Sequence, residues 1–126
     1  MHHVLIAGHN PARLLHVEQA LAEHGGFYLH RASTHDQAMR ITNETPISAA
    51  IVDEEFSDMS GAAFVRSLMI SHPLINCALV SPLYSNEFHE ATEGLGIFMQ
   101  LPSPPDQQSG KALVDLLSRL LSITTS

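Results

Sequence analysis

The sequence has little cysteine, little positive charge and no long apolar run, and each shortage excludes a class of protein. Cys77 is the only cysteine, so no disulfide can form within the chain, which favours a reducing compartment. Six basic residues stand against thirteen acidic ones, a formal net charge of −7, and no basic cluster is present to neutralise phosphates. No apolar stretch reaches the length of a membrane span, and the first residues lack the pattern of a signal peptide. We therefore predict a cytosolic protein that binds neither nucleic acid nor membrane.

The composition that remains is that of one globular domain. A hydrophobic fraction of 44% with 15% charged residues excludes a disordered or low-complexity chain. A length of 126 residues is enough to bury one core without disulfides or metals. We predict a single domain over residues 1–126, with no effector domain after it.

Short apolar runs alternate along the chain with amphipathic segments of helical period. This alternation is typical of βαβ units, and it predicts an α/β protein whose five parallel strands carry five helices on both faces of the sheet. The strands are expected at 4–7, 27–32, 48–52, 75–80 and 97–100. The helices are expected to begin near Asn10, Thr34, Gly61, Asn86 and Asp106.

A carboxylate ends the third of these strands. Asp53 follows an apolar run and is itself followed by Glu54 and Glu55, while the first strand delivers Gly8 and His9. Because parallel strands one and three end at the same edge of an open sheet, these five residues are expected to share one pocket. That edge is where ligands bind in open α/β sheets, so Asp53 is the leading candidate for a functional residue.

The segment 53–61, with Ser81 after the next apolar run and Leu101 at the end of the last one, resembles the receiver domain of bacterial two-component response regulators. The resemblance spans the whole chain and implies a flavodoxin-like, doubly wound sheet in the order 2-1-3-4-5 with five helices. It makes Asp53 the phosphoacceptor for a histidine kinase. It also makes Ser81 and Phe98 the two residues that switch position with the phosphoryl group.

Two departures from the family pattern remove positive charge from the pocket. The acidic pair that the family places after strand one is replaced by Gly8 and His9, which offer no hard oxygen ligand, so Mg²⁺ is expected to bind weakly at most. The lysine that the family places after strand five is replaced by Leu101. A third change, Ser57 in place of the usual proline of the loop, removes no reactive group. Because phosphoryl transfer depends on charge stabilisation, we predict slow or no phosphorylation of Asp53.

The predicted function is therefore that of an atypical, receiver-like signalling module. It is not an enzyme, holds no firmly bound cofactor, and acts mainly by binding a signalling protein or a histidine kinase. The alternative is a conventional, phosphorylatable single-domain receiver in a His-Asp phosphorelay, with Asp53 as the acceptor.

His9 carries two further hypotheses. Its imidazolium is expected to pair with Asp53 or Glu54 in place of the missing cations, or else to be an ordinary exposed side chain at a helix start. A weaker hypothesis groups His9, Asp53 and Glu54 as ligands of a softer metal such as Zn²⁺, which accepts nitrogen and carboxylate together.

The last predicted helix carries a broad leucine stripe. The stripe is most simply core packing, but it is wide enough for one edge to remain exposed for a partner or a second copy of the chain. The resemblance to receiver domains, which often form dimers through this part of the fold, favours a homodimer. Its members are Leu113, Leu116, Leu117, Leu120 and Leu121.

Overall fold

The computed structural model describes residues 1–56 and 58–125 and contains one five-stranded parallel sheet in the order β2-β1-β3-β4-β5, which confirms the predicted fold class and strand order. The strands are β1 (His2–Ala7), β2 (Phe27–Ala32), β3 (Ile47–Val52), β4 (Asn76–Val80) and β5 (Ile97–Leu101). The helices are α1 (Leu15–His24), α2 (His35–Glu44), α3 (Gly61–Ser71), α4 (Ser85–Ala91) and α5 (Gln107–Thr125), with a short 3₁₀ turn, η1 (Pro11–Leu14), before α1.

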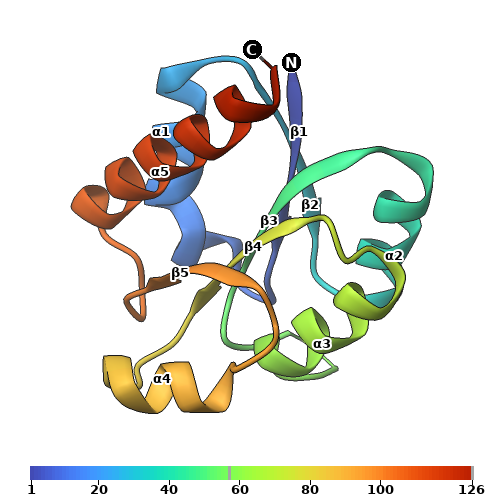
Figure 1. Ribbon diagram of the computed structural model, residues 1–126, viewed down its shortest axis with the longest axis vertical. Coiled ribbons are helices and arrows are strands. Elements are labelled where there is room, and N and C mark those ends of the chain that lie inside the picture. The colour runs from blue at the N-terminus through green and yellow to red at the C-terminus, as the bar shows by residue number, and fades with distance from the viewer. Residues whose placement is uncertain (57, 126) are drawn as a thin grey trace.

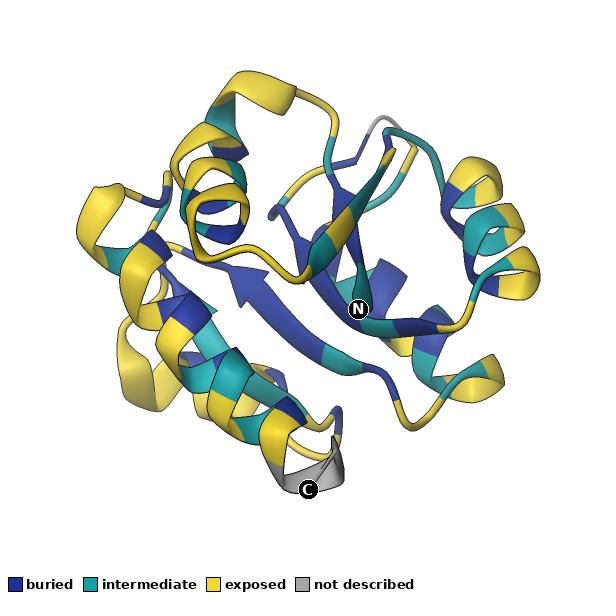
Figure 2. Ribbon diagram, turned by 90° about the horizontal axis from the view of Figure 1, so that it is seen from above, coloured by how far each residue is buried: buried dark blue, intermediate teal, exposed yellow. Residues whose placement is uncertain are grey.

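The helices cover both faces of the sheet. Helices α1 and α5 lie side by side on one face, and α2 and α3 lie on the other, where α4 also packs (Figure 1). Each face has its own apolar core, and β1, β3 and β4 are buried between the two (Figure 2). Strands buried on both faces read as continuous apolar runs, which is why these three were visible in the sequence.

Two helix starts follow the predicted capping chemistry. Thr34 Oγ1 accepts the backbone N–H of Gln37 at 3.2 Å, and the Gln37 side chain accepts the backbone N–H of Ser33 at 2.9 Å. At α5, Asp106 Oδ1 accepts the backbone N–H of Ser109 at 2.7 Å. That bond stabilises the ionised carboxylate and therefore holds the pKa of Asp106 below its usual value.

The first helix differs from the prediction in its first turn. Asn10 does act as the cap, accepting the backbone N–H of Ala12 at 3.1 Å, but residues Pro11–Leu14 form a 3₁₀ turn before the α-helix begins at Leu15. The backbone N–H of Arg13 bonds to the carbonyl of Asn10, the tighter spacing of a 3₁₀ turn. This turn therefore sets the backbone position from which the Arg13 side chain extends.

The leucine stripe of α5 divides into a buried row and a half-buried edge. Leu113, Leu117 and Leu121 belong to the core shared with α1, whereas Leu116 and Leu120 remain partly exposed. The helix, which has 19 residues, is thus amphipathic, with one apolar side in the core and one side toward solvent. Within residues 1–56 and 58–125, no helix is both long enough and apolar enough to cross a membrane.

The single cysteine provides a test of the fold. Cys77 lies in β4 with no exposed surface, and burial raises the pKa of its thiol to about 12. Because the thiolate is the reactive form, we expect Ellman's reagent at mildly alkaline pH to leave the folded protein unlabelled and to modify one thiol per chain in urea. Labelling of the native protein at the rate of a free thiol would contradict this packing.

Candidate functional site

Asp53 lies at the carboxyl end of β3, as predicted, and its backbone is held on two sides. Its N–H donates to the carbonyl of Ala7 at the end of β1, 2.8 Å away. The following loop is closed by the N–H of Gly61, which donates to the carbonyl of Glu54 at 2.8 Å. Asp53 as a whole is only 1% exposed. A carboxylate this deeply buried requires a partner for its charge.

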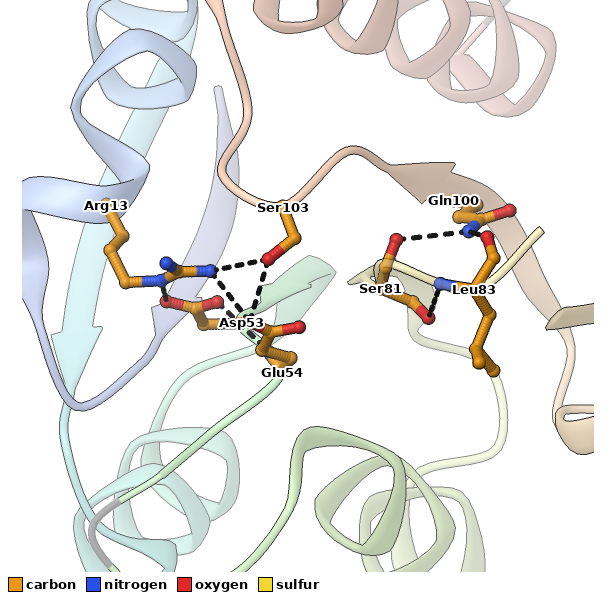
Figure 3. Close-up of polar contacts among 7 residues, drawn as sticks. All are labelled: Arg13, Asp53, Glu54, Ser81, Leu83, Gln100 and Ser103. Atoms are coloured by element: carbon orange, nitrogen blue, oxygen red, sulfur yellow. Dashed lines mark hydrogen bonds and ion pairs between the residues drawn. The ribbon is translucent and has the colours of Figure 1, made fainter. Parts of the chain in front are cut away.

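That partner is the guanidinium of Arg13. Its Nε lies 2.9 Å from Oδ2 of Asp53, and its Nη2 lies 3.0 Å from Oε1 of Glu54 (Figure 3). The Arg13 side chain is 30% exposed, whereas the carboxylate that it reaches is 2% exposed. The planar guanidinium therefore extends inward from η1 and binds two carboxylates of the β3–α3 loop at once, which a lysine ammonium could not do with the same geometry.

A third loop completes this cluster through Ser103, which follows β5. The Ser103 hydroxyl donates to Oε1 of Glu54 at 2.7 Å and accepts from Nη2 of Arg13 at 3.0 Å (Figure 3). We call Arg13, Asp53, Glu54 and Ser103 the arginine clamp. The clamp joins the loops that follow β1, β3 and β5, three segments that are far apart in the sequence.

Both oxygens of the Asp53 carboxylate are engaged. Oδ1 accepts the backbone N–H of Glu54 at 2.8 Å, and Oδ2 accepts from Arg13. The same contact raises the pKa of Arg13, chiefly through its hydrogen bond to Asp53. Arg13 is thus charged throughout the accessible pH range, and the clamp is an ion pair rather than a neutral contact.

The expectation that the pocket has lost its usual positive charge without replacement by an arginine is therefore wrong. The cation is not His9, which is exposed and meets this region through its backbone, whose N–H donates to the carbonyl of Glu55 at 3.3 Å. In the described part of the chain, no ion pair involves His9, so the hypothesis that its imidazolium pairs with Asp53 or Glu54 is not supported.

Leu101, predicted to stand at the family's lysine position, lies outside the site. It is fully buried in the core shared with α1 and α5, and its carbonyl accepts the N–H of Ser81 at 3.0 Å. The residue of this loop that reaches Glu54 is Ser103, two positions further on. Ser57, another predicted departure, lies outside the described residues.

The two predicted switch residues lie in different surroundings, one in a loop and one against the core. Ser81 lies at the end of β4, where its Oγ accepts the N–H of Leu83 at 3.2 Å. Phe98 packs against the core on the α1 and α5 face. The β5 side chain that contacts the loop of Ser81 is Gln100, whose Nε2 donates to the carbonyls of Ser81 at 3.1 Å and Leu83 at 2.8 Å. Figure 3 shows this second network beside the arginine clamp, with no bond between the two.

The residues of the pocket do not fit a hard divalent cation. Glycine at position 8 supplies no side-chain oxygen, and a Cβ there would lie only 3.0 Å from the Cβ of Asp53. The guanidinium of Arg13 already neutralises the carboxylates that Mg²⁺ would need. Within residues 1–56 and 58–125 no three His, Cys, Asp or Glu side chains are grouped to hold a metal, so the zinc site predicted from His9, Asp53 and Glu54 is not formed.

The fold is that of response-regulator receiver domains, although no family model and no curated protein matches the sequence. A CheY-like receiver domain protein from Methanospirillum hungatei is 18% identical, with a TM-score of 0.78 over 97% of this chain and 94% of that one. The chemotaxis response regulator CheY4 of Vibrio cholerae is 16% identical, with a TM-score of 0.79 over 93% of this chain and 98% of that one. The receiver domain of a signal transduction histidine kinase from Syntrophus aciditrophicus is 22% identical, with a TM-score of 0.76 over 97% and 91%.

Proposed function

We propose that this chain, which has the receiver-domain fold, is a signalling module that works by binding a partner protein, with Asp53 held by Arg13 instead of accepting a phosphoryl group. The observation that carries the proposal is the arginine clamp, in which the guanidinium lies 2.9 Å from Asp53 Oδ2. In this proposal the carboxylate of Asp53 has a structural role.

Phosphoryl transfer to Asp53 would require a free carboxylate oxygen with room for an in-line approach. Here Oδ2 is bound by Arg13, Oδ1 is bound by the backbone of Glu54, and the residue is almost fully buried. An incoming phosphate would have to break the ion pair and open the pocket. Among the described residues, Arg13 is the basic side chain that forms ion pairs with Asp53 and Glu54, and it is already engaged by both. The barrier to phosphoryl transfer is therefore raised for two reasons: the carboxylate of Asp53 is hard to reach, and the charge of the phosphate is not offset.

A partner protein is supported by the neighbours and by the surface near the site. Similar receiver domains belong to a signal transduction histidine kinase and to an HD domain-containing protein, so the fold occurs in proteins that carry further domains. Beside the Gln100 contact, Leu83 and Tyr84 leave 40% and 80% of their surface exposed.

The homodimer stays a prediction, and its contact surface would include Leu116 and Leu120, the half-buried edge of the leucine stripe. Light scattering on the protein as it elutes from a size-exclusion column measures its mass and therefore tests whether it is a dimer.

Acetyl phosphate with Mg²⁺ tests the proposal. We expect intact-mass spectrometry to detect no phosphorylated species under conditions that fully label a conventional receiver domain treated in parallel. In the same way, beryllofluoride with Mg²⁺ is expected to leave the amide resonances of Ser81 and Gln100 unshifted. A mass gain of one phosphoryl group that disappears in Asp53→Asn would overturn the proposal and establish the relay function instead.

A further inference from the structure

Two histidines meet on the α2 and α3 face of the sheet, apart from the arginine clamp. His3 lies near the start of β1 and His30 lies in β2; in the parallel register His3 pairs with Tyr28 and Leu5 pairs with His30, so the side chains are diagonal neighbours on one face. Nδ1 of His3 lies 2.8 Å from Nε2 of His30, with ring centroids 5.1 Å apart. Tyr28 stacks on His3, with centroids 5.2 Å apart and planes 20° apart.

We propose that His3 and His30 form a binding site for a tetragonal divalent cation, Cu²⁺ in the first place and Ni²⁺ in the second. The argument rests on the distance between the two nitrogens. Imidazole nitrogens bind such ions at roughly 2.0 Å, so two ligands at a right angle lie about 2.8 Å apart, whereas two ligands of a tetrahedral ion lie about 3.3 Å apart. The observed 2.8 Å is the length of the hydrogen bond in the metal-free pair. Because it equals the first spacing, a tetragonal ion can take the place of the shared proton without separating the two nitrogens.

The two rings are also chemically ready to accept a metal. In the metal-free pair one nitrogen donates a proton and the other accepts it. When the ion enters, the donating ring moves its proton to its other nitrogen, both lone pairs turn toward the metal, and no net proton is released. Both side chains are half-buried, so water can fill the remaining positions of the coordination plane. The stacked Tyr28 limits how far the His3 ring can turn away.

Geometry predicts selectivity among metals as well as binding. A tetrahedral ion such as Zn²⁺ requires the two nitrogens to separate by about half an ångström, with the His3 ring held on one side by the stacked Tyr28. A square-planar or tetragonal ion needs rotation of the rings alone. Together with the intrinsic preference of nitrogen ligands for Cu²⁺, this gives the expected order Cu²⁺ above Ni²⁺ above Zn²⁺.

Titration calorimetry with Cu²⁺, Ni²⁺ and Zn²⁺ in separate runs tests the site. We expect one Cu²⁺ per chain, weakened about tenfold or more in both His3→Gln and His30→Gln. The matched control is His89→Gln, which removes an exposed histidine of α4 and is expected to leave the affinity unchanged. If His30→Gln binds as tightly as the parent, the ion is held elsewhere, for example by His2 and His3 alone, and the proposal fails.

A second readout does not depend on any variant remaining folded. The electron paramagnetic resonance spectrum of the Cu²⁺ complex of the parent protein is expected to be axial, with couplings from two imidazole nitrogens. A spectrum with one imidazole nitrogen, or Zn²⁺ binding that equals Cu²⁺ binding, would overturn the assignment.

Discussion

Replacing Arg13 by alanine is expected to lower the free energy of unfolding by about 2–3 kcal/mol at neutral pH. Removing one partner of a buried ion pair commonly costs about 3–5 kcal/mol, because the remaining charge stays buried without compensation. The lower figure applies here because the Arg13 side chain is 30% exposed and its contact with Glu54 is partly screened by water. The large remaining effect comes from Asp53, whose carboxylate would keep only the backbone N–H of Glu54.

Urea denaturation of a double-mutant cycle measures this effect. The cycle compares Arg13→Ala, Asp53→Asn and the double variant, and we expect the double variant to be more stable than Arg13→Ala alone, since it leaves no unpaired charge. Arg66→Ala is the matched control, because Arg66 is exposed on α3 and its loss should change stability by less than about 0.5 kcal/mol. Equal effects of Arg13→Ala and Arg66→Ala would show that the clamp contributes nothing to stability.

Replacing Gly61 by alanine is expected to be at least as damaging, with a loss of about 3 kcal/mol or more. A Cβ at position 61 would lie 2.1 Å from the backbone oxygen of Asp53 and 2.8 Å from Cδ1 of Leu79. The first contact is with backbone that is fixed to β1, so it cannot be relieved by a rotamer change. Alanine would favour the helix by up to about 1 kcal/mol, which is too little to offset the clash.

Gly94→Ala separates this clash from the general cost of losing a glycine. Gly94 has φ of +83°, but a Cβ there would meet nothing within 4 Å, so only the backbone conformation is penalised, by about 1 kcal/mol. Thermal and urea unfolding of both variants give the comparison. If Gly61→Ala lowers the free energy of unfolding by no more than Gly94→Ala does, then α3 does not approach the end of β3 as closely as described.

The sheet could be predicted from the sequence because its signals are local. Three central strands are apolar on both faces, and Thr34 and Asp106 carry their capping partners within three residues. The placement of Asp53 at the ligand-binding edge follows from strand order, which the alternation of segments already restricts. These inferences needed no knowledge of contacts between distant residues.

The arginine clamp could not be predicted in the same way. Arg13 and Asp53 are 40 residues apart, and whether the guanidinium points at the carboxylate depends on a 3₁₀ turn that local patterns do not distinguish from the first turn of an α-helix. The receiver-domain pattern also predicts its basic residue after strand five, so it does not indicate Arg13. The same reliance on family positions placed Leu101 in the site, where the structure has Ser103.

Proton–nitrogen correlation spectra of the arginine side chains test the central claim most directly. The Nε–H of Arg13, assigned by its loss in Arg13→Ala, is expected to be shifted and slow to exchange with water, because it donates to Asp53. It should keep that resonance on addition of millimolar Mg²⁺ with beryllofluoride and should move to the position of a free arginine in Asp53→Asn. If instead it matches a free arginine in the parent protein, or is released by Mg²⁺ and beryllofluoride, Asp53 is available for phosphorylation and the arginine clamp does not define this protein.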